Sequence, residues 1–80
     1  MNDNEILQHI QQLVNEEHEL MTSAEQQPLT EEQHARMQQL QVHLDQLWDL
    51  LRQRRARREF GLNPNEANER DPSIVEHYLQ

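Results

Sequence analysis

The sequence has no cysteine, no lysine and a single glycine among its 80 residues. Without cysteine, disulfides and thiolate metal sites are excluded, and no oxidising compartment is implied. Only three prolines interrupt the chain, and the long stretches between them favour helix over sheet. No apolar run is long enough to cross a bilayer, and the N-terminus lacks the basic and apolar segments of a secretory signal. We therefore expect a cytoplasmic protein that makes no membrane contact.

Positive charge is also scarce, since the sequence has fifteen acidic residues but only seven arginines, and the formal net charge is −8. Phosphate backbones and anionic lipids repel such a chain, so any contact with them must be local. The length allows one small domain at most. Although only 34% of the residues are apolar, they are clustered, which argues against disorder.

Two amphipathic helices are predicted, over residues of about 4–22 and 31–60. The first carries one apolar stripe, and Asp3 is its expected N-cap. Pro28 prevents a continuous helix through the following segment. The second opens on "TEEQ", a capping box formed by Thr30 and Gln33, and Gly61 is the expected left-handed stop. Its apolar residues follow at alternating spacings of three and four: Met37, Leu40, Leu44, Leu47 and Leu51.

The predicted fold is therefore all-α, with an antiparallel helical hairpin over residues 1–61 and a tail over residues 62–80. In the tail, Asn63 with Pro64 and Asp71 with Pro72 are expected to start short helical turns. The tail also has apolar side chains that should dock on the hairpin or on a partner protein: Ile74, Val75, Tyr78 and Leu79.

The apolar stripes are too wide for one hairpin to cover, so we expect a homodimer that forms a four-helix bundle. The dimer or core seam is predicted to contain Ile10, Leu13, Val14, Leu40, Leu44, Leu47, Trp48 and Leu51. The corresponding function is that of a small interaction or adaptor protein, with an unidentified protein partner also possible.

Five arginines gather near the end of the second helix: Arg52, Arg54, Arg55, Arg57 and Arg58. They could match acidic residues of the protein, either Asp3 and Glu5 in the same chain or the hairpin turn of a second copy. The alternative is a nucleic-acid-binding surface, which we expect to gather its arginines on one side of a helix. These arginines point in several directions, so charge matching is the favoured interpretation.

Nothing in the sequence indicates an enzyme or a cofactor, because no nucleophile stands beside a base and no glycine loop could cradle phosphate. Glu17 lies within the first apolar stripe and is expected to be a buried polar contact, with a buried acid or ligand as the alternative. A metal-binding helical bundle is a further alternative, because Glu31 and His34 have the spacing of a helical ligand pair. The other histidines are too widely spaced along their helices to share an ion.

Three segments, "ILQHIQQLVNEEHEL", "LDQLWDLLRQRRARREFGLNPNEA" and "VEHYL", together resemble a small bacterial family catalogued as domain of unknown function 2630. The resemblance covers nearly all of the chain, and the segment from Trp48 to Ala67 is its most specific part. It implies an intact small bacterial protein. It brings no activity and no site residues.

Overall fold

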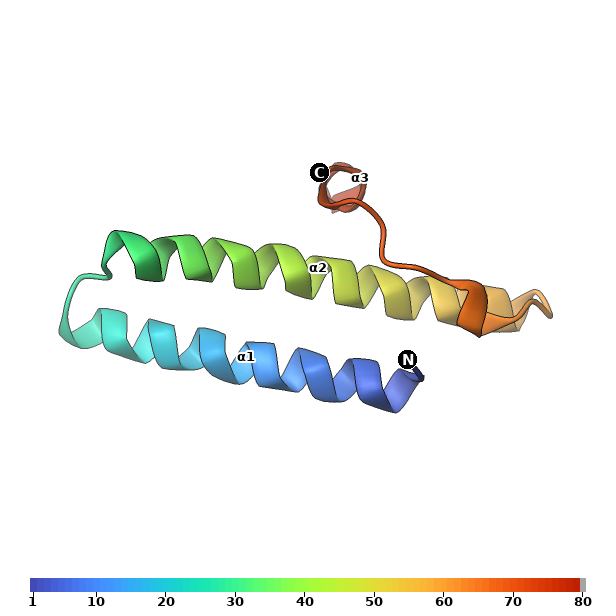
Figure 1. Ribbon diagram of the computed structural model, residues 1–80, viewed down its shortest axis with the longest axis horizontal. Coiled ribbons are helices and arrows are strands. Elements are labelled where there is room, and N and C mark those ends of the chain that lie inside the picture. Colours follow the sequence, from blue (N-terminus) through green and yellow to red (C-terminus); the bar gives the residue numbers. More distant parts are fainter. Residues whose placement is uncertain (80) are drawn as a thin grey trace.

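The computed structural model describes residues 1–79, with the side chains of residues 1–76, as four helical elements. Helices α1 (Asp3–Gln26) and α2 (Glu31–Glu59) lie side by side in opposite directions and form a hairpin (Figure 1). A short 3-10 helix, η1 (Pro64–Glu66), and helix α3 (Pro72–Leu79) make up the tail. No strand occurs among residues 1–79, so the predicted all-α hairpin is confirmed.

Helix α1 begins one residue earlier than the sequence indicates, because Asn2 and not Asp3 is its N-cap. The Asn2 side chain accepts a hydrogen bond from the Glu5 amide at 2.8 Å, and the Glu5 carboxylate accepts one from the Asn2 amide at 3.1 Å. This reciprocal capping box satisfies two backbone donors. Asp3 becomes the first helical residue, with its carboxylate available for other contacts. The helix then continues to Gln26, beyond the expected end, and stops ahead of Pro28.

Both ends of α2 have the local structure that the sequence predicts. The Thr30 hydroxyl accepts a hydrogen bond from the Gln33 amide at 3.1 Å, and the Gln33 side chain accepts one from the Thr30 amide at 2.9 Å. At the other end Gly61 has a φ of 72°. The Gly61 amide donates a hydrogen bond to the Arg58 carbonyl at 3.1 Å, and the Leu62 amide donates one to the Arg57 carbonyl at 2.7 Å. These two bonds form the Schellman motif that a left-handed glycine allows.

The hydrophobic core lies between the two long helices. Ile6 of α1 and Leu47 of α2 are fully buried in it. Because residues three, four and seven apart share one side of a helix, the two stripes meet between α1 and α2, and their buried residues lie in the half of the hairpin away from the turn. The buried core residues are Ile6, Ile10, Leu13, Leu40, Leu44, Leu47 and Leu50. Leu20, Leu51 and Ala67 pack against them while remaining partly exposed.

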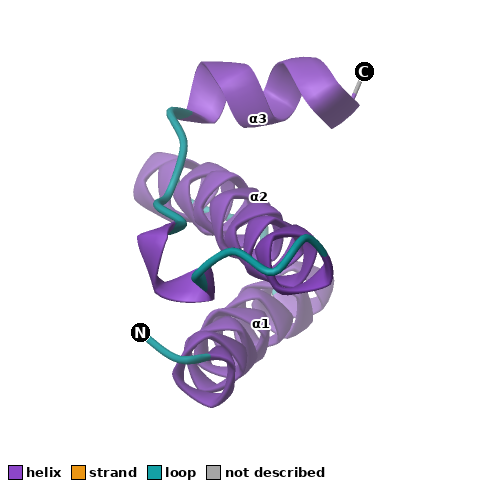
Figure 2. Ribbon diagram, turned by 90° about the vertical axis from the view of Figure 1, so that its right-hand side faces the viewer, coloured by secondary structure: helices purple, strands orange, loops and turns teal. Residues whose placement is uncertain are grey.

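The tail returns along α2 after the glycine turn. Viewed along the hairpin, α2 lies between α1 and α3, and α3 crosses α2 instead of running beside it (Figure 2). Val75 is 1% exposed, whereas Ile74 on the same helix is about half exposed at 47%. The tail therefore docks on its own chain, and Val75 is its buried anchor. None of the described helices is long and apolar enough to cross a membrane.

Candidate interaction site at the arginine end of the hairpin

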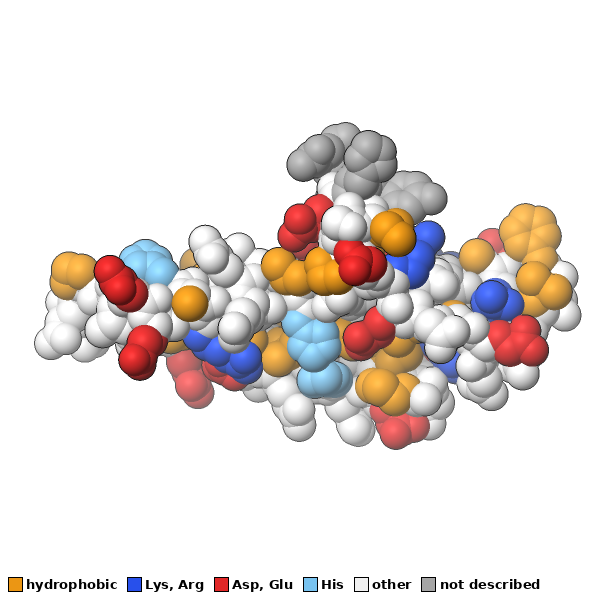
Figure 3. All heavy atoms as spheres, turned by 45° about the horizontal axis from the view of Figure 1, so that its top comes forward, with side chains coloured by type: hydrophobic (Ala, Val, Ile, Leu, Met, Phe, Trp, Pro, Cys, Tyr) orange, Lys and Arg blue, Asp and Glu red, His pale blue; other side chains and the backbone are white. Residues whose placement is uncertain are grey.

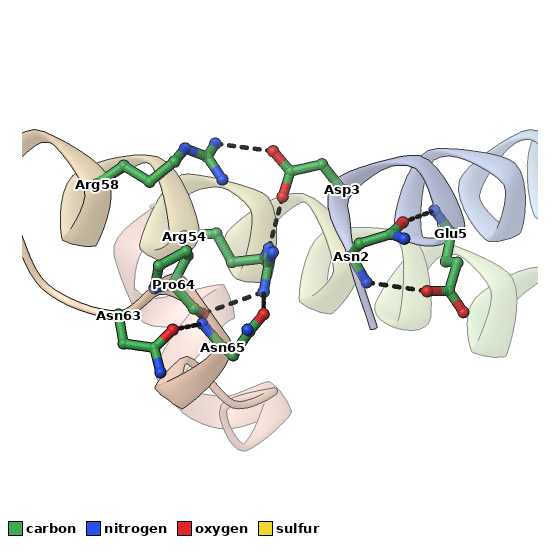
Figure 4. A network of polar contacts seen from close by, with 8 residues as sticks. All are labelled: Asn2, Asp3, Glu5, Arg54, Arg58, Asn63, Pro64 and Asn65. Carbon is green, nitrogen blue, oxygen red and sulfur yellow. Dashed lines mark hydrogen bonds and ion pairs between the residues drawn. The ribbon is translucent and has the colours of Figure 1, made fainter.

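Arg54 connects the start of α1 to the tail (Figure 4). Its side chain is 7% exposed, and its Nε donates a hydrogen bond to Asp3 Oδ1 at 2.5 Å. Its Nη1 donates to the Pro64 carbonyl and to Asn65 Oδ1, each at 3.1 Å. A buried guanidinium is stable only when its donors and its charge are matched, and here α1 and η1 supply the acceptors. Arg54 therefore ties α1, α2 and η1 together.

Asp3 also binds a second arginine, Arg58, whose Nη2 lies 2.8 Å from Asp3 Oδ2. The hydrogen bonds from Arg58 and then from Arg54 lower the pKa of the Asp3 carboxyl below its usual value of 3.8. Arg57, the residue before Arg58, pairs with the tail: its Nη1 lies 3.6 Å from Oε2 of Glu66 in η1. The expected match between the arginine cluster and Asp3 is thus observed for two arginines. Glu5, the other expected partner, is held in its capping box instead.

A second ion pair fixes the tail farther along α2. Asp49 is 3% exposed and accepts hydrogen bonds from Arg70 through both carboxylate oxygens, with Arg70 Nε 2.8 Å from Oδ2. Gln53 Nε2 donates to the same oxygen at 2.9 Å and to the Asn68 carbonyl at 2.8 Å. Hydrogen bonds from Arg70 hold the pKa of Asp49 below its usual value, against the opposing effect of burial. Asp49 is therefore not a solvated surface residue, because the tail covers it.

An open groove lies beside this end of the hairpin, where α1 begins and the last turns of α2 run past it. Its apolar lining consists of Leu7, Trp48 and Leu51, and its volume is about 330 Å³. The charged side chains that line it are Asp3, Arg52, Arg55 and Arg58. We call these seven residues the arginine groove.

The arginines of the cluster have different roles. Arg54, Arg57 and Arg58 pair with acidic side chains of the same chain. Among the described residues Arg52 and Arg55 have no ion-pair partner, and both are exposed. The charge available to another molecule is therefore concentrated on Arg52 and Arg55, at the rim of an apolar surface.

The predicted seam residues divide into two groups. Five of them are buried in the hairpin core, namely Ile10, Leu13, Leu40, Leu44 and Leu47, and Leu51 is partly buried. Val14 and Trp48 reach solvent, with 38% and 44% exposed. The sequence interpretation missed the exposure of Leu7 and Met21, which lie seven residues before and after Val14. The surface that a second copy could contact is therefore narrower than the predicted seam.

The remaining predicted residues have mixed positions. Glu17 is partly buried. In the tail, Val75 is buried and Ile74 is exposed, while the side chains of Tyr78 and Leu79 lie outside the described part of the chain. Two contacts on the face that carries the tail were missed. The His9 and His43 rings pack edge to face, with their centroids 4.9 Å apart. His43 Nε2 lies 3.8 Å from Glu69 Oε1.

That face carries acidic and basic side chains interspersed over both long helices (Figure 3). Arg36 forms a bidentate pair with Glu16 across the hairpin, with Nη2 2.8 Å from Oε1. Within the described residues, no three histidine or acidic side chains converge as a metal ion requires. The distinguishing feature of the hairpin surface is therefore the arginine groove and not a polar cluster.

Residues 2–80 match a family whose description is "Protein of unknown function (DUF2630)". The chain belongs to this family. DUF2630 is thus confirmed as the family indicated by the sequence resemblance. The chain is similar to uncharacterised proteins of Mycobacterium tuberculosis and Mycobacterium bovis, each 43% identical over 77 residues. The aligned region covers 95% of this chain and 88% of each relative. No solved structure matches the chain.

The DUF2630 match covers the hairpin and the tail together. It therefore includes the capping boxes, the Gly61 turn and both ion-pair networks. The family description names no activity, so the function is inferred below from surface geometry and charge.

Proposed function

We propose that this protein is a small, non-catalytic interaction protein that self-associates through one open face of its hairpin. The open face consists of Leu7, Val14, Met21 and Trp48. The proposal is supported by the position of these side chains. Leu7, Val14 and Met21 are seven residues apart and form one stripe on α1. Leu7 lies with Trp48 in the same groove, so the stripe and the α2 side chain belong to one surface.

The free energy available at this face is moderate. Each of the four side chains is between 38% and 56% exposed. Full burial of a large apolar side chain contributes roughly 1.5–3 kcal/mol, so about half of that remains to be gained at each position. Two copies together supply eight such side chains, against an association cost of several kcal/mol. We therefore expect a weak, reversible dimer, with a dissociation constant between the micromolar and the millimolar range.

Charge matching within the chain reduces the support for the nucleic-acid alternative. A nucleic-acid-binding surface gains affinity from each cation that contacts a phosphate. Three of the five clustered arginines are already paired with carboxylates of this chain. The two remaining arginines offer little positive charge for phosphate contacts on a chain with a net charge of −8. Protein association is therefore the better-supported function.

Sedimentation velocity over a concentration series tests the proposal. We expect a shift from monomer to dimer between the micromolar and the millimolar range, and Val14→Arg should move it to higher concentration because it places a charge within the apolar stripe. Gln12→Arg is the matched control. Gln12 is exposed and lies two residues away, which puts it on another side of α1. A folded wild-type chain that stays monomeric at about 1 mM would refute the proposal, and so would equal effects of the two variants.

A further inference from the structure

The two ends of the hairpin have opposite surface charge. Before Arg36 the sequence contains no basic residue other than histidine. The turn end therefore carries exposed carboxylates, from Glu25 in the last turns of α1 and Glu31 at the start of α2, without a nearby guanidinium in the sequence. The opposite end carries Arg52 and Arg55, which are exposed and form no ion pair among the described residues, although the charge of Arg52 contributes to the lowered pKa of Asp49. Each hairpin thus has an unmatched acidic end and an unmatched basic end.

On α1, the apolar spacing of the open face is symmetric about Val14. Leu7 and Met21 are equally far from Val14 along α1. On α2, Gln41 is midway between His34 and Trp48, and it lies one turn from the buried Leu44. A two-fold axis through the Val14 and Gln41 layer would therefore place Leu7 of one copy against Met21 of the other, and Trp48 of one copy against His34 of the other.

We propose that the arginine groove binds the acidic turn end of a second copy, so that two hairpins associate antiparallel about this axis. The proposal rests on the self-association proposed above and assigns its orientation and its polar contacts. Arg52 and Arg55 of each copy then face Glu25 and Glu31 of the other, at both ends of the dimer. A parallel pair would bring Arg52 and Arg55 against the same arginines of the second copy. Unscreened like charges oppose that arrangement, whereas opposite charges favour the antiparallel one.

Distances between spin labels distinguish the two orientations. The chain has no cysteine, so Glu59→Cys and Gln26→Cys each provide one exposed labelling site without altering the open face. At 1.5 Å per residue, residue 59 lies about 27 Å along α2 from the proposed axis. An antiparallel dimer therefore separates two Glu59→Cys labels by roughly 55 Å, close to the 50 Å length of the molecule. A parallel dimer places the same labels at one end, well under half that distance apart.

A mixture of the two labelled variants gives the complementary result. In the antiparallel dimer, a label at position 59 of one copy lies near a label at position 26 of the other, so a short distance appears only in the mixture. A short distance between two Glu59→Cys labels overturns the proposed orientation. A chain that sediments as a monomer gives no intermolecular distance, and in that case self-association itself has failed.

Charge reversal tests the proposed ion pairs separately from the orientation. We expect Arg55→Glu to raise the dimer dissociation constant by about tenfold, because both ends of the dimer lose an attraction and gain a repulsion. Arg57→Glu is the matched control. It changes the net charge equally, but Arg57 faces Glu66 in η1 and not the groove. Equal effects of the two variants would contradict the proposed pairing even if the labels show an antiparallel dimer.

Restoration of binding by compensating variants completes the test. Arg52→Glu with Arg55→Glu in one chain, and Glu25→Arg with Glu31→Arg in another, should each weaken the homodimer. A mixture of the two chains should form a heterodimer with nearly wild-type affinity, because both of its ends again pair opposite charges. If the mixture associates no better than either double variant alone, the groove does not bind the acidic turn end.

Discussion

Replacing Arg54 by methionine should destabilise the fold far more than the same replacement of Arg58. The two arginines share one acceptor, Asp3, but they differ in burial. The side chain of Arg54 is 7% exposed and also donates to the Pro64 carbonyl and to Asn65, whereas that of Arg58 is 45% exposed. Methionine retains much of the apolar volume of the arginine stem, so the comparison isolates the polar contacts.

The size of the effect follows from the contacts that are lost. A hydrogen bond to a charged group contributes about 1.5–3 kcal/mol, and one between less polar partners about 1 kcal/mol. Asp3 is about one-third exposed and still binds Arg58 in the variant. Loss of the bond between Arg54 and Asp3 should therefore cost an amount near the lower limit of that range. We expect Arg54→Met to lower the free energy of unfolding by about 3 kcal/mol. An exposed pair contributes at most about 1 kcal/mol, which bounds the effect of Arg58→Met.

Thermal and urea unfolding followed by circular dichroism measure this difference. For a chain of this length, ~2 kcal/mol separates the two melting temperatures by roughly 8–16 °C. Both variants must be compared at one protein concentration, because the proposed self-association would stabilise the folded state by mass action. If Arg54→Met and Arg58→Met melt within a degree or two of each other, the view that Arg54 holds three elements together is wrong.

Two further predictions concern other contacts. The pKa of Asp49 is lower in the folded chain than its ordinary value of 3.8, so its stabilising effect is complete above about pH 5 and is lost as the pH falls toward the folded pKa. With Asp49→Asn, the free energy of unfolding should therefore decrease less as the pH falls below about 5. The same variant should make α3 accessible to proteases at neutral pH. Asp45→Asn, the control, should have neither effect. Gly61→Ala should lower the free energy of unfolding by about 1 kcal/mol. Since a Cβ at Gly61 meets no atom within 4 Å, the effect arises from its φ of 72° alone, and an unchanged urea midpoint would contradict it.

The elements that could be predicted from the sequence depend on local signals. The Thr30 capping box, the Gly61 turn and the Asn63 cap each involve residues within a few positions of one another. The hydrophobic stripes are local in the same sense, because helical spacing is enough to define a buried side. The error at the start of α1 is instructive. Asn2 and Asp3 are both good N-caps, and Glu5 three residues after Asn2 was the signal that distinguishes them.

The buried ion pairs could not be predicted in the same way. Arg54 and Asp3 are 51 residues apart, and Asp49 and Arg70 are 21 apart, so no local rule connects them. One signal for Arg54 was nevertheless present. Leu40, Leu47 and Arg54 are spaced by seven residues, which places Arg54 on the buried side of α2 and not among the exposed arginines. The position of an arginine relative to this seven-residue spacing thus predicts its burial better than its membership of the arginine cluster does.

The arrangement around α2 explains why one sector of this helix remains open. Leu40, Leu47 and Arg54 face α1, whereas Asp49 faces the tail through Arg70. Trp48 precedes Asp49 by one residue, and a helix turns about 100° per residue, so Trp48 cannot share the sector that the tail covers. The tail instead contacts α2 through polar side chains that include Gln46, Asp49 and Gln53, and Val75 is its buried apolar side chain. Trp48 therefore stays exposed beside Arg55 in the arginine groove, and this is the sector at which we propose that a second copy binds.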